Sequence, residues 1–236
     1  MQRWQADRWP RAETAPDPVF VRATTLADLT DLGFPPPPEN YPLVWDAQDQ
    51  VGLRPTGHLL ARCAALAAVL AAVFAVPPKL ACQWLRENGL LDAVTEPEWR
   101  FLAAGQGSGD LYGLHIEAAW GLSWVLGVAE ELDPSRYCGE GLAAWLPNVG
   151  AGEPFYDWWD RAGVRPRAAG EVAALLDLHY CLDYAHARAL AAGEPPPGSS
   201  QPYVVGQRRW ALEWALVFSG PNQPPPAPWD EVDLVP

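Results

Sequence analysis

Basic residues are scarce in this 236-residue chain, and that scarcity restricts what the protein binds. Lys and Arg together number 16 against 29 Asp and Glu, so the formal net charge is −13, and Lys79 is the single lysine. A nucleic-acid backbone and an anionic membrane surface would both be repelled by such a charge. We therefore expect no nucleic acid and no membrane as partners. Solubility alone is the simpler explanation of the negative charge, and a basic protein is the partner that this charge would favour.

Signatures of the common catalytic and cofactor sites are also absent from the sequence. There is no glycine-rich phosphate loop, no G-x-S-x-G nucleophile elbow and no H-E-x-x-H metal motif. The first ten residues lack the apolar stretch of a signal peptide. The most apolar run, residues 63–76, is short and Ala-rich for a membrane span, so it predicts a buried helix. We expect a cytoplasmic protein with no cofactor and assign no catalytic residue.

Cysteine usage supports the same compartment. The four cysteines are scattered along the chain without C-x-x-C spacing: Cys63, Cys82, Cys138 and Cys181. In a chain with no secretory context, scattered cysteines are more typical of small buried residues in a reducing compartment than of disulfides.

The residue pattern predicts an all-α fold. Hydrophobic residues make up 49% of the chain and charged residues 19%, a globular balance, and no strand-like alternation of any length is present. We expect a single compact domain of roughly eight helices over residues 57–219. An irregular Pro-rich leader (1–56) would pack on this domain, and Trp229 would anchor a Pro-rich tail (220–236).

Several helix boundaries have local signals. Thr95 followed by Glu98 predicts a capping box, and prolines 77 and 78 separate two helices. Longer helices are predicted over 58–76, 111–132, 168–192 and 203–218, with a short one from Thr25 to Leu32 and two more near Trp145 and over 155–162.

Tryptophan is unusually frequent, with 13 residues, and two segments share the pattern W-x-L-x-W-x-L. Residues 120–126 and 210–216 each place two indoles four residues apart, on one helix face. We interpret them as ridges of two core helices that meet, because large aromatic side chains are usually buried.

Charged residues precede both ridges and define a candidate polar cluster. Glu117 precedes the first ridge, Arg208 and Arg209 precede the second, and Asp177 and Tyr180 lie on the predicted helix 168–192. One interpretation is structural, with Glu117 paired to Arg208 or Arg209 inside the protein. The alternative is that these side chains line a site for a small polar ligand or a substrate.

A metal site has only weak candidates. His179, Asp183 and His186 follow each other at spacings of four and three on one helix face. Each neighbouring pair could hold a metal, but the two histidines would lie about 10.5 Å apart along a helix axis, at 1.5 Å per residue, which is awkward for one ion. We therefore predict no metal site, and expect these histidines to be hydrogen-bonded within the protein.

Taken in order, these landmarks resemble a bacterial domain of unknown function, number 4272. The residues that carry the resemblance run from Arg54 to Val232: Trp84-Leu85, Thr95 with Glu98, Glu117-Ala118 with Trp124, Arg167, Glu171-Val172, Asp177, Tyr180, Arg208-Arg209, Trp214 and Trp229-Asp230. The resemblance implies a helical bacterial protein without an established activity. We expect a soluble, non-enzymatic interaction protein with an accessory or immunity-type role; the alternative is an enzyme or small-ligand binder that uses the polar cluster.

Overall fold

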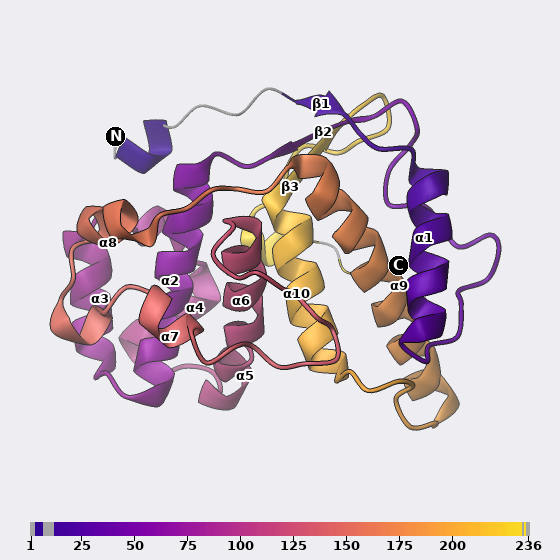
Figure 1. Cartoon of the computed structure of the whole chain (residues 1–236). Coiled ribbons are helices and arrows are strands. Elements are labelled where there is room, and N and C mark those ends of the chain that lie inside the picture. The colour runs from indigo at the N-terminus through magenta and orange to yellow at the C-terminus, as the bar shows by residue number, and fades with distance from the viewer. Residues whose placement is uncertain (1–2, 7–11, 233, 235–236) are drawn as a thin grey trace. The chain divides into compact units, whose positions relative to one another are not determined.

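The longest described helix, α9 (Ala169–Ala192), lies where the sequence predicted it, and Gly193 ends it with a φ of 69°. The computed structural model describes residues 3–6, 12–232 and 234, and most of that part of the chain is helical. Figure 1 shows the order of these elements. The predicted helical fold class is confirmed, with the addition of one small sheet.

The chain forms two compact units that are interleaved along the sequence. Unit 1 takes residues 1–9, 55–130 and 138–166, and unit 2 takes residues 10–54, 131–137 and 167–236. The predicted leader and tail thus fall largely in the unit that contains α9. The predicted domain boundaries at residues 56 and 219 stay predictions.

Unit 1 is built around α2 (Thr56–Phe74), which packs against α3, α5 and α6. The elements of unit 1 besides α2 are η1 (Arg3–Ala6), α3 (Pro78–Glu87), η2 (Leu91–Ala93), α4 (Glu96–Ala104), α5 (Gly109–Gly113), α6 (His115–Val125), α7 (Leu142–Trp145), η3 (Val149–Ala151) and α8 (Phe155–Ala162). By length and composition α2 could cross a membrane, but 72% of its most apolar window is buried inside the protein. That burial is typical of the core helix of a soluble globular domain.

A buried ion pair ties α2 to α4. The guanidinium of Arg62 donates to both carboxylate oxygens of Glu98, one at 2.9 Å, and to the carbonyl of Ala93 at 2.7 Å. Both side chains are 2% exposed. Glu98 also completes the capping box that the sequence predicted, because it accepts from the Thr95 N–H while the Thr95 hydroxyl accepts from the Glu98 N–H.

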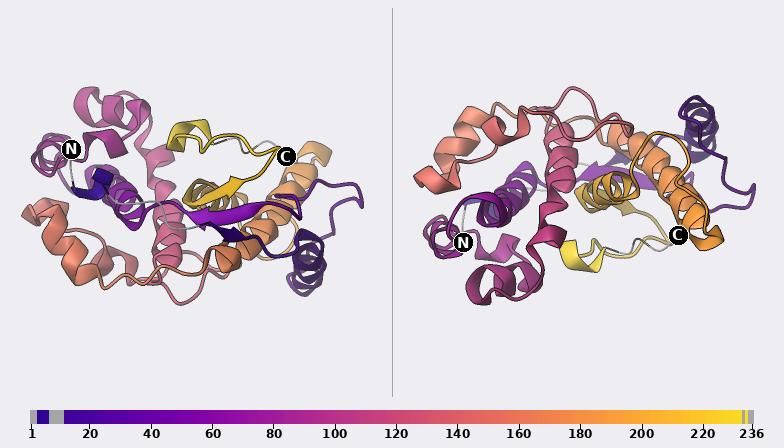
Figure 2. Two further views of the ribbon diagram at one scale, coloured as in Figure 1. Left: turned by 90° about the horizontal axis from the view of Figure 1, so that it is seen from above. Right: turned by 90° about the horizontal axis from the view of Figure 1, so that it is seen from below.

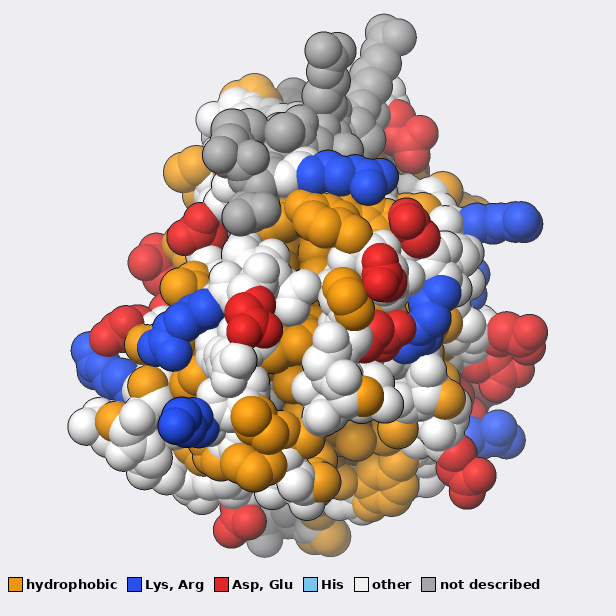
Figure 3. Space-filling view, turned by 90° about the vertical axis from the view of Figure 1, so that its left-hand side faces the viewer, with side chains coloured by type: hydrophobic (Ala, Val, Ile, Leu, Met, Phe, Trp, Pro, Cys, Tyr) orange, Lys and Arg blue, Asp and Glu red, His pale blue; other side chains and the backbone are white. Residues whose placement is uncertain are grey.

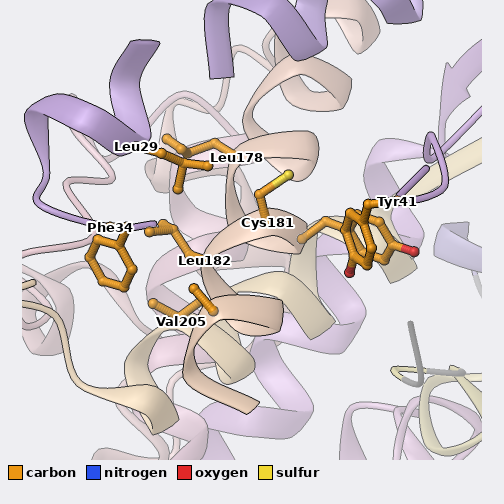
Figure 4. Packing of buried hydrophobic residues seen from close by; sticks show 9 residues of the cluster. Leu29, Phe34, Tyr41, Leu178, Cys181, Leu182 and Val205 are labelled. Carbon is orange, nitrogen blue, oxygen red and sulfur yellow. The ribbon is translucent and has the colours of Figure 1, made fainter. Parts of the chain in front are cut away.

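Unit 2 is organised by α9, which packs against both α1 (Pro18–Asp31) and α10 (Pro202–Ala215). Its core contains Leu178, Cys181 and Leu182 of α9, with Leu29 from α1 and Val205 from α10 (Figure 4). A short helical turn near the C-terminus, η4 (Trp229–Glu231), completes the unit together with the sheet.

The sheet has three antiparallel strands in the order β1 (Glu13–Thr14), β2 (Gln50–Leu53) and β3 (Leu216–Ser219). Its register pairs Val51 with Phe218 and Leu53 with Leu216. The Trp45 indole stacks on the Phe218 ring at a centroid distance of 5.4 Å. The residues Leu216 to Phe218 were predicted to end a helix, which was wrong: α10 stops at Ala215 and the chain continues as β3.

Two other helices differ from their predictions. The first begins at Pro18, not Thr25, because the Asp17 side chain accepts from the N–H of Val19 at 2.9 Å and caps it. The predicted helix 111–132 is instead two shorter helices, α5 and α6, and ends at Val125. Gly127 follows with a φ of 73°, and a Cβ there would lie 2.1 Å from the Arg165 carbonyl oxygen.

The Arg62–Glu98 pair yields a stability prediction. Glu98→Gln leaves a buried guanidinium without its counter-charge, so we expect the free energy of unfolding in urea at pH 7 to fall by about 3–5 kcal/mol. Glu96→Gln is the matched control on the same helix. Its pair with Arg100 has side chains 63% and 60% exposed, so the expected change is under about 0.5 kcal/mol.

The pH dependence follows from the same pair. Burial alone would raise the pKa of Glu98, but Arg62 and the Thr95 N–H outweigh it and hold the pKa below its usual value. The stabilisation is therefore fully present above the unfolded pKa of about 4.3 and is lost as pH falls through the lower folded pKa. Wild-type protein should lose more stability than Glu98→Gln between pH 7 and pH 3; equal losses would contradict the assignment.

Candidate functional site

An ion pair fixes α1 to α9 at one of the predicted site residues. The Asp177 carboxylate accepts from Arg22 Nη2 at 2.7 Å and from Nε at 3.0 Å, and the two side chains are 2% and 11% exposed. Arg22 also donates to the carbonyl of Pro42 at 3.0 Å. Burial lowers the pKa of Arg22, but the hydrogen bond and charge of Asp177, together with Cys181 and Tyr41, outweigh burial, so the net shift is upward. The side chain of Asp177 is thus enclosed by a structural partner.

Arg209 joins α10 to α9 and to the C-terminal tail. Its Nη1 donates to Asp183 at 2.6 Å and to the Leu234 carbonyl at 2.8 Å, and its Nε to Glu213 at 3.3 Å. The guanidinium lies over the Tyr180 ring, 4.7 Å from its centroid. The structure therefore brings together Tyr180 and Arg209, both predicted site residues, in a position where Arg209 is 1% exposed.

The neighbouring Arg208 holds the short segment 131–137. It is fully buried and donates to the carbonyls of Asp133 at 2.6 Å and Arg136 at 2.7 Å. Glu117 belongs to unit 1, where its carboxylate accepts from the Cys138 N–H at 2.9 Å. The pairing of Glu117 with Arg208 or Arg209 stays a prediction.

The three weak metal candidates have separate partners. His179 is fully buried with Nδ1 3.0 Å from the Leu175 carbonyl oxygen, and burial lowers its pKa to about 4. His186 lies 3.1 Å from the Ser200 hydroxyl through Nε2, and Asp183 accepts from Arg209. In the described part of the chain, no three His, Cys, Asp or Glu side chains are placed to hold one metal ion.

The second tryptophan ridge contacts the tail. Trp229 stacks on Trp210 at a centroid distance of 5.5 Å and meets Trp214 edge-on at 5.3 Å. Trp210 Nε1 donates to the Trp229 carbonyl at 2.7 Å. The predicted anchoring of the tail by Trp229 and the meeting of the two ridges both stay predictions.

Unit 2 contains two cavities. One, of about 410 Å³, is lined by Arg54, Glu213, Trp214, residues 216–218 and the tail. The other, of about 440 Å³, lies between prolines 35–38 and the C-terminal end of α9. Neither is lined by Asp177, Tyr180, Arg208 or Arg209. These four predicted residues therefore do not surround either volume.

Arg54 was missed at the sequence level and lines the first cavity. It donates to the carbonyls of Trp214 at 2.5 Å and Ala227 at 2.6 Å, and its guanidinium lies over the Trp214 ring. Burial lowers its pKa to about 10. Arg22, the partner of Asp177, was also missed; the two residues are 155 positions apart, a separation that no local pattern reveals.

The acidic charge of the chain is concentrated in unit 2. Unit 2 contains 17 Asp and Glu and eight Arg, a net charge of −9, and unit 1 contains 12 acidic and eight basic residues, a net of −4. Among the described arginines of unit 2, only Arg136 and Arg188 are exposed. Eleven of its acidic residues are exposed: Glu13, Asp17, Asp28, Asp31, Glu39, Asp46, Glu131, Glu171, Glu194, Asp230 and Glu231. Figure 3 shows the face on the left-hand side of Figure 1, where basic and acidic side chains are interspersed.

Comparison with known families agrees with the resemblance seen in the sequence. A family described as a domain of unknown function (DUF4272) matches residues 22–232. The chain belongs to this family. The match begins at Arg22, well before the first landmark of the resemblance, and ends at Val232. No curated protein and no solved structure matches the chain. Membership in DUF4272 assigns no activity, so a functional argument depends on the geometry of this chain.

The Arg22–Asp177 pair can be tested as a structural element. Asp177→Asn removes a carboxylate that accepts two charged hydrogen bonds, so the free energy of unfolding should fall by about 2 kcal/mol or more. The exposed Asp28→Asn on α1 is the control, with an expected change within about 0.5 kcal/mol. Both values are measured by urea denaturation. If the free energy of unfolding of Asp177→Asn equals that of the wild type, the Asp177 carboxylate does not contribute to stability.

Proposed function

We propose that this DUF4272 chain is a soluble, non-enzymatic interaction protein of the bacterial cytoplasm whose acidic unit 2 surface binds a basic protein partner. An accessory or immunity-type role, in which the chain covers a basic partner, is the form that we favour. The observation that carries the proposal is the placement of charge in unit 2. Its arginines are mostly buried or half-buried, while eleven of its carboxylates are exposed.

This placement makes the surface more acidic than the composition alone implies. Arg22 and Arg209 are paired with Asp177 and Asp183, so these charges cancel within the unit. Arg208 is fully buried, and Arg54 donates to backbone carbonyls, so neither guanidinium is displayed on the surface. The exposed carboxylates then produce a field of one sign, which accelerates association with an oppositely charged protein and disfavours anionic partners. Nucleic acid and anionic membranes are disfavoured on the same ground.

The rival interpretation, an enzyme or a binder of small polar ligands, requires a polar cluster that a ligand can reach. Asp177, Arg208 and Arg209 are each at most 1% exposed, and each has hydrogen-bond partners in its own unit. A carboxylate already bound by a guanidinium would have to release it before it could bind a substrate. This enclosure supports the interaction role over the rival.

A reducing compartment is consistent with the cysteines. All four lie in the described part of the chain and form no disulfide, and three of them are buried. Burial raises the pKa of the Cys181 thiol to about 12, so this thiol is protonated and unreactive at neutral pH. These are the properties of structural cysteines in a cytoplasmic protein.

The test begins with affinity capture from cells that naturally produce the chain, followed by binding measurements on the purified pair. We expect the captured protein to have a basic surface. Its affinity should fall at least tenfold between about 50 and 300 mM NaCl, because salt screens attraction between exposed charges. A partner whose binding is insensitive to salt would contradict the proposal.

Charge reversal locates the surface that binds. The variant Asp28→Lys/Asp31→Lys changes two exposed carboxylates of α1 in unit 2, and Asp157→Lys/Asp160→Lys changes two exposed carboxylates of α8 in unit 1 at the same spacing. Both variants alter the net charge equally. We expect the α1 variant to reduce the association rate about tenfold and the α8 variant by less than threefold. Equal effects would show that the net charge, not unit 2, determines binding.

A further inference from the structure

One edge of the small sheet is open. The strand order is β1, β2, β3, so among the described residues β3 has a partner strand on one side only. An edge strand presents backbone N–H and C=O groups that can pair with an extended segment of another protein. The question is which groups of β3 point outward and what lies beside them.

The hydrogen-bond alternation of the ladder identifies these groups. The Arg54 N–H donates to the Ala215 carbonyl at 2.8 Å. Arg54 and Ala215 lie opposite each other, next to the paired residues Leu53 and Leu216. In an antiparallel ladder, pairs that exchange hydrogen bonds alternate with pairs that do not. Val217 therefore pairs with Gly52 through hydrogen bonds, whereas the N–H and C=O of Phe218 point away from β2.

The second edge of β2 confirms this alternation. The Ala15 N–H donates to the Asp49 carbonyl at 3.0 Å, next to the β1–β2 ladder. By the same rule, the pair Glu13–Val51 exchanges hydrogen bonds, so the backbone of Val51 is directed toward β1. Val51 faces Phe218 across the ladder, so neither residue uses its backbone groups for the other.

The cavity of about 410 Å³ lies along this outer edge. It is lined by Leu216, Val217 and Phe218 on one side and by the tail residues 223–227 on the other. Figure 2 shows the tail on the side of β3 away from β2. Three consecutive tail residues, 224–226, are prolines and have no N–H to donate. In the described part of the chain, the outward N–H and C=O of Phe218 have no hydrogen-bond partner.

The cavity also carries excess negative charge. Glu213, whose side chain is 32% exposed, and the exposed Glu231 both line it. Its one guanidinium, that of Arg54, donates to the carbonyls of Trp214 and Ala227 and lies over the Trp214 ring. Glu213 is already paired with Arg209, so the exposed Glu231 is the lining carboxylate that favours a cationic side chain in an incoming segment.

We propose that the outer edge of β3 binds an extended basic segment of the partner protein, which pairs its backbone with Phe218 and places a Lys or Arg beside Glu231. This inference rests on the proposed function, and it specifies where the basic partner docks and in what conformation. The cavity volume lies within the range of roughly 300–1,000 Å³ that is usual for ligand sites.

The test uses three fluorescent peptides of about nine residues and the full chain. One peptide alternates Lys and Thr, which favours an extended conformation. The second has the same sequence with alternate backbone nitrogens methylated, and the third has Glu in place of Lys. By fluorescence anisotropy we expect the first to bind, the second to bind at least tenfold more weakly and the third not to bind.

Amide hydrogen exchange, measured by NMR, identifies the edge. Binding of the Lys–Thr peptide should slow exchange at the Phe218 N–H at least tenfold. Val217, whose N–H faces β2, is the internal control and should change by less than twofold. Glu231→Lys should weaken peptide binding at least tenfold, whereas Glu194→Lys, an exposed position at the other cavity, should change it less than threefold.

The outcomes separate this inference from the proposed function. Equal binding of the plain and methylated peptides, with no protection at Phe218, overturns strand pairing but leaves a basic partner in place. Failure of every basic peptide, while a captured partner still binds in a salt-sensitive way, overturns only the β3 site. Light scattering that shows a dimer abolished by Glu231→Lys would make a second copy of the chain the occupant, and would also overturn the inference.

Discussion

The need of buried arginine side chains for acceptors governs the architecture of unit 2. A guanidinium removed from water must find carboxylates or carbonyls, or the cost of burial is several kcal/mol. Arg22 meets this need with Asp177 and the chain at Pro42, Arg209 with Asp183 and Glu213, and Arg208 with two backbone carbonyls. These bonds connect α1, α10, the segment 131–137 and the tail to a frame centred on α9. They specify which segments meet, while the apolar side chains in Figure 4 supply most of the burial.

The same constraint determines the charge of the surface. Each arginine drawn inward is one fewer positive charge outside, and unit 2 already has more acidic than basic residues. Its exposed carboxylates are therefore left largely without exposed counter-charges. The burial of arginines that the fold requires is thus also a cause of the acidic surface on which the proposed recognition depends. On the proposed function, Asp177 and Arg209, which look like parts of a ligand site in the sequence, contribute to recognition only indirectly, through what they leave exposed.

Local signals in the sequence predicted much of the helical fold. The capping box at Thr95 and Glu98, the glycine after α9 and the prolines before α3 each act within a few residues, so they are readable from the chain alone. The Asp17–Pro18 start of α1 was also readable and was missed, because Thr25 offered a competing cap. The strand β3 was not readable: its four residues continue an apolar helical pattern, and their partner strand lies more than 160 positions away.

The candidate site was predictable only in part, for the same reason. Helix periodicity assigned Asp177 and Tyr180 to the same predicted helix, and the structure places the Arg209 guanidinium of another helix over the Tyr180 ring. Their burial and the identity of their partners depend on long-range packing, which composition and spacing do not encode. No sequence pattern marked Arg22 or Arg54 as buried, because an isolated Arg in a segment predicted to be irregular and Pro-rich is expected to be exposed to solvent.

The most direct test of this account is a residue-by-residue measurement of the surface potential. NMR relaxation caused by a cationic and an anionic nitroxide gives the near-surface electrostatic potential at each backbone amide. The account predicts that exposed amides of unit 2 have a clearly more negative mean potential than those of unit 1. Equal mean potentials in the two units, or a more negative unit 1, would contradict the claim that inward arginines leave unit 2 with the acidic surface.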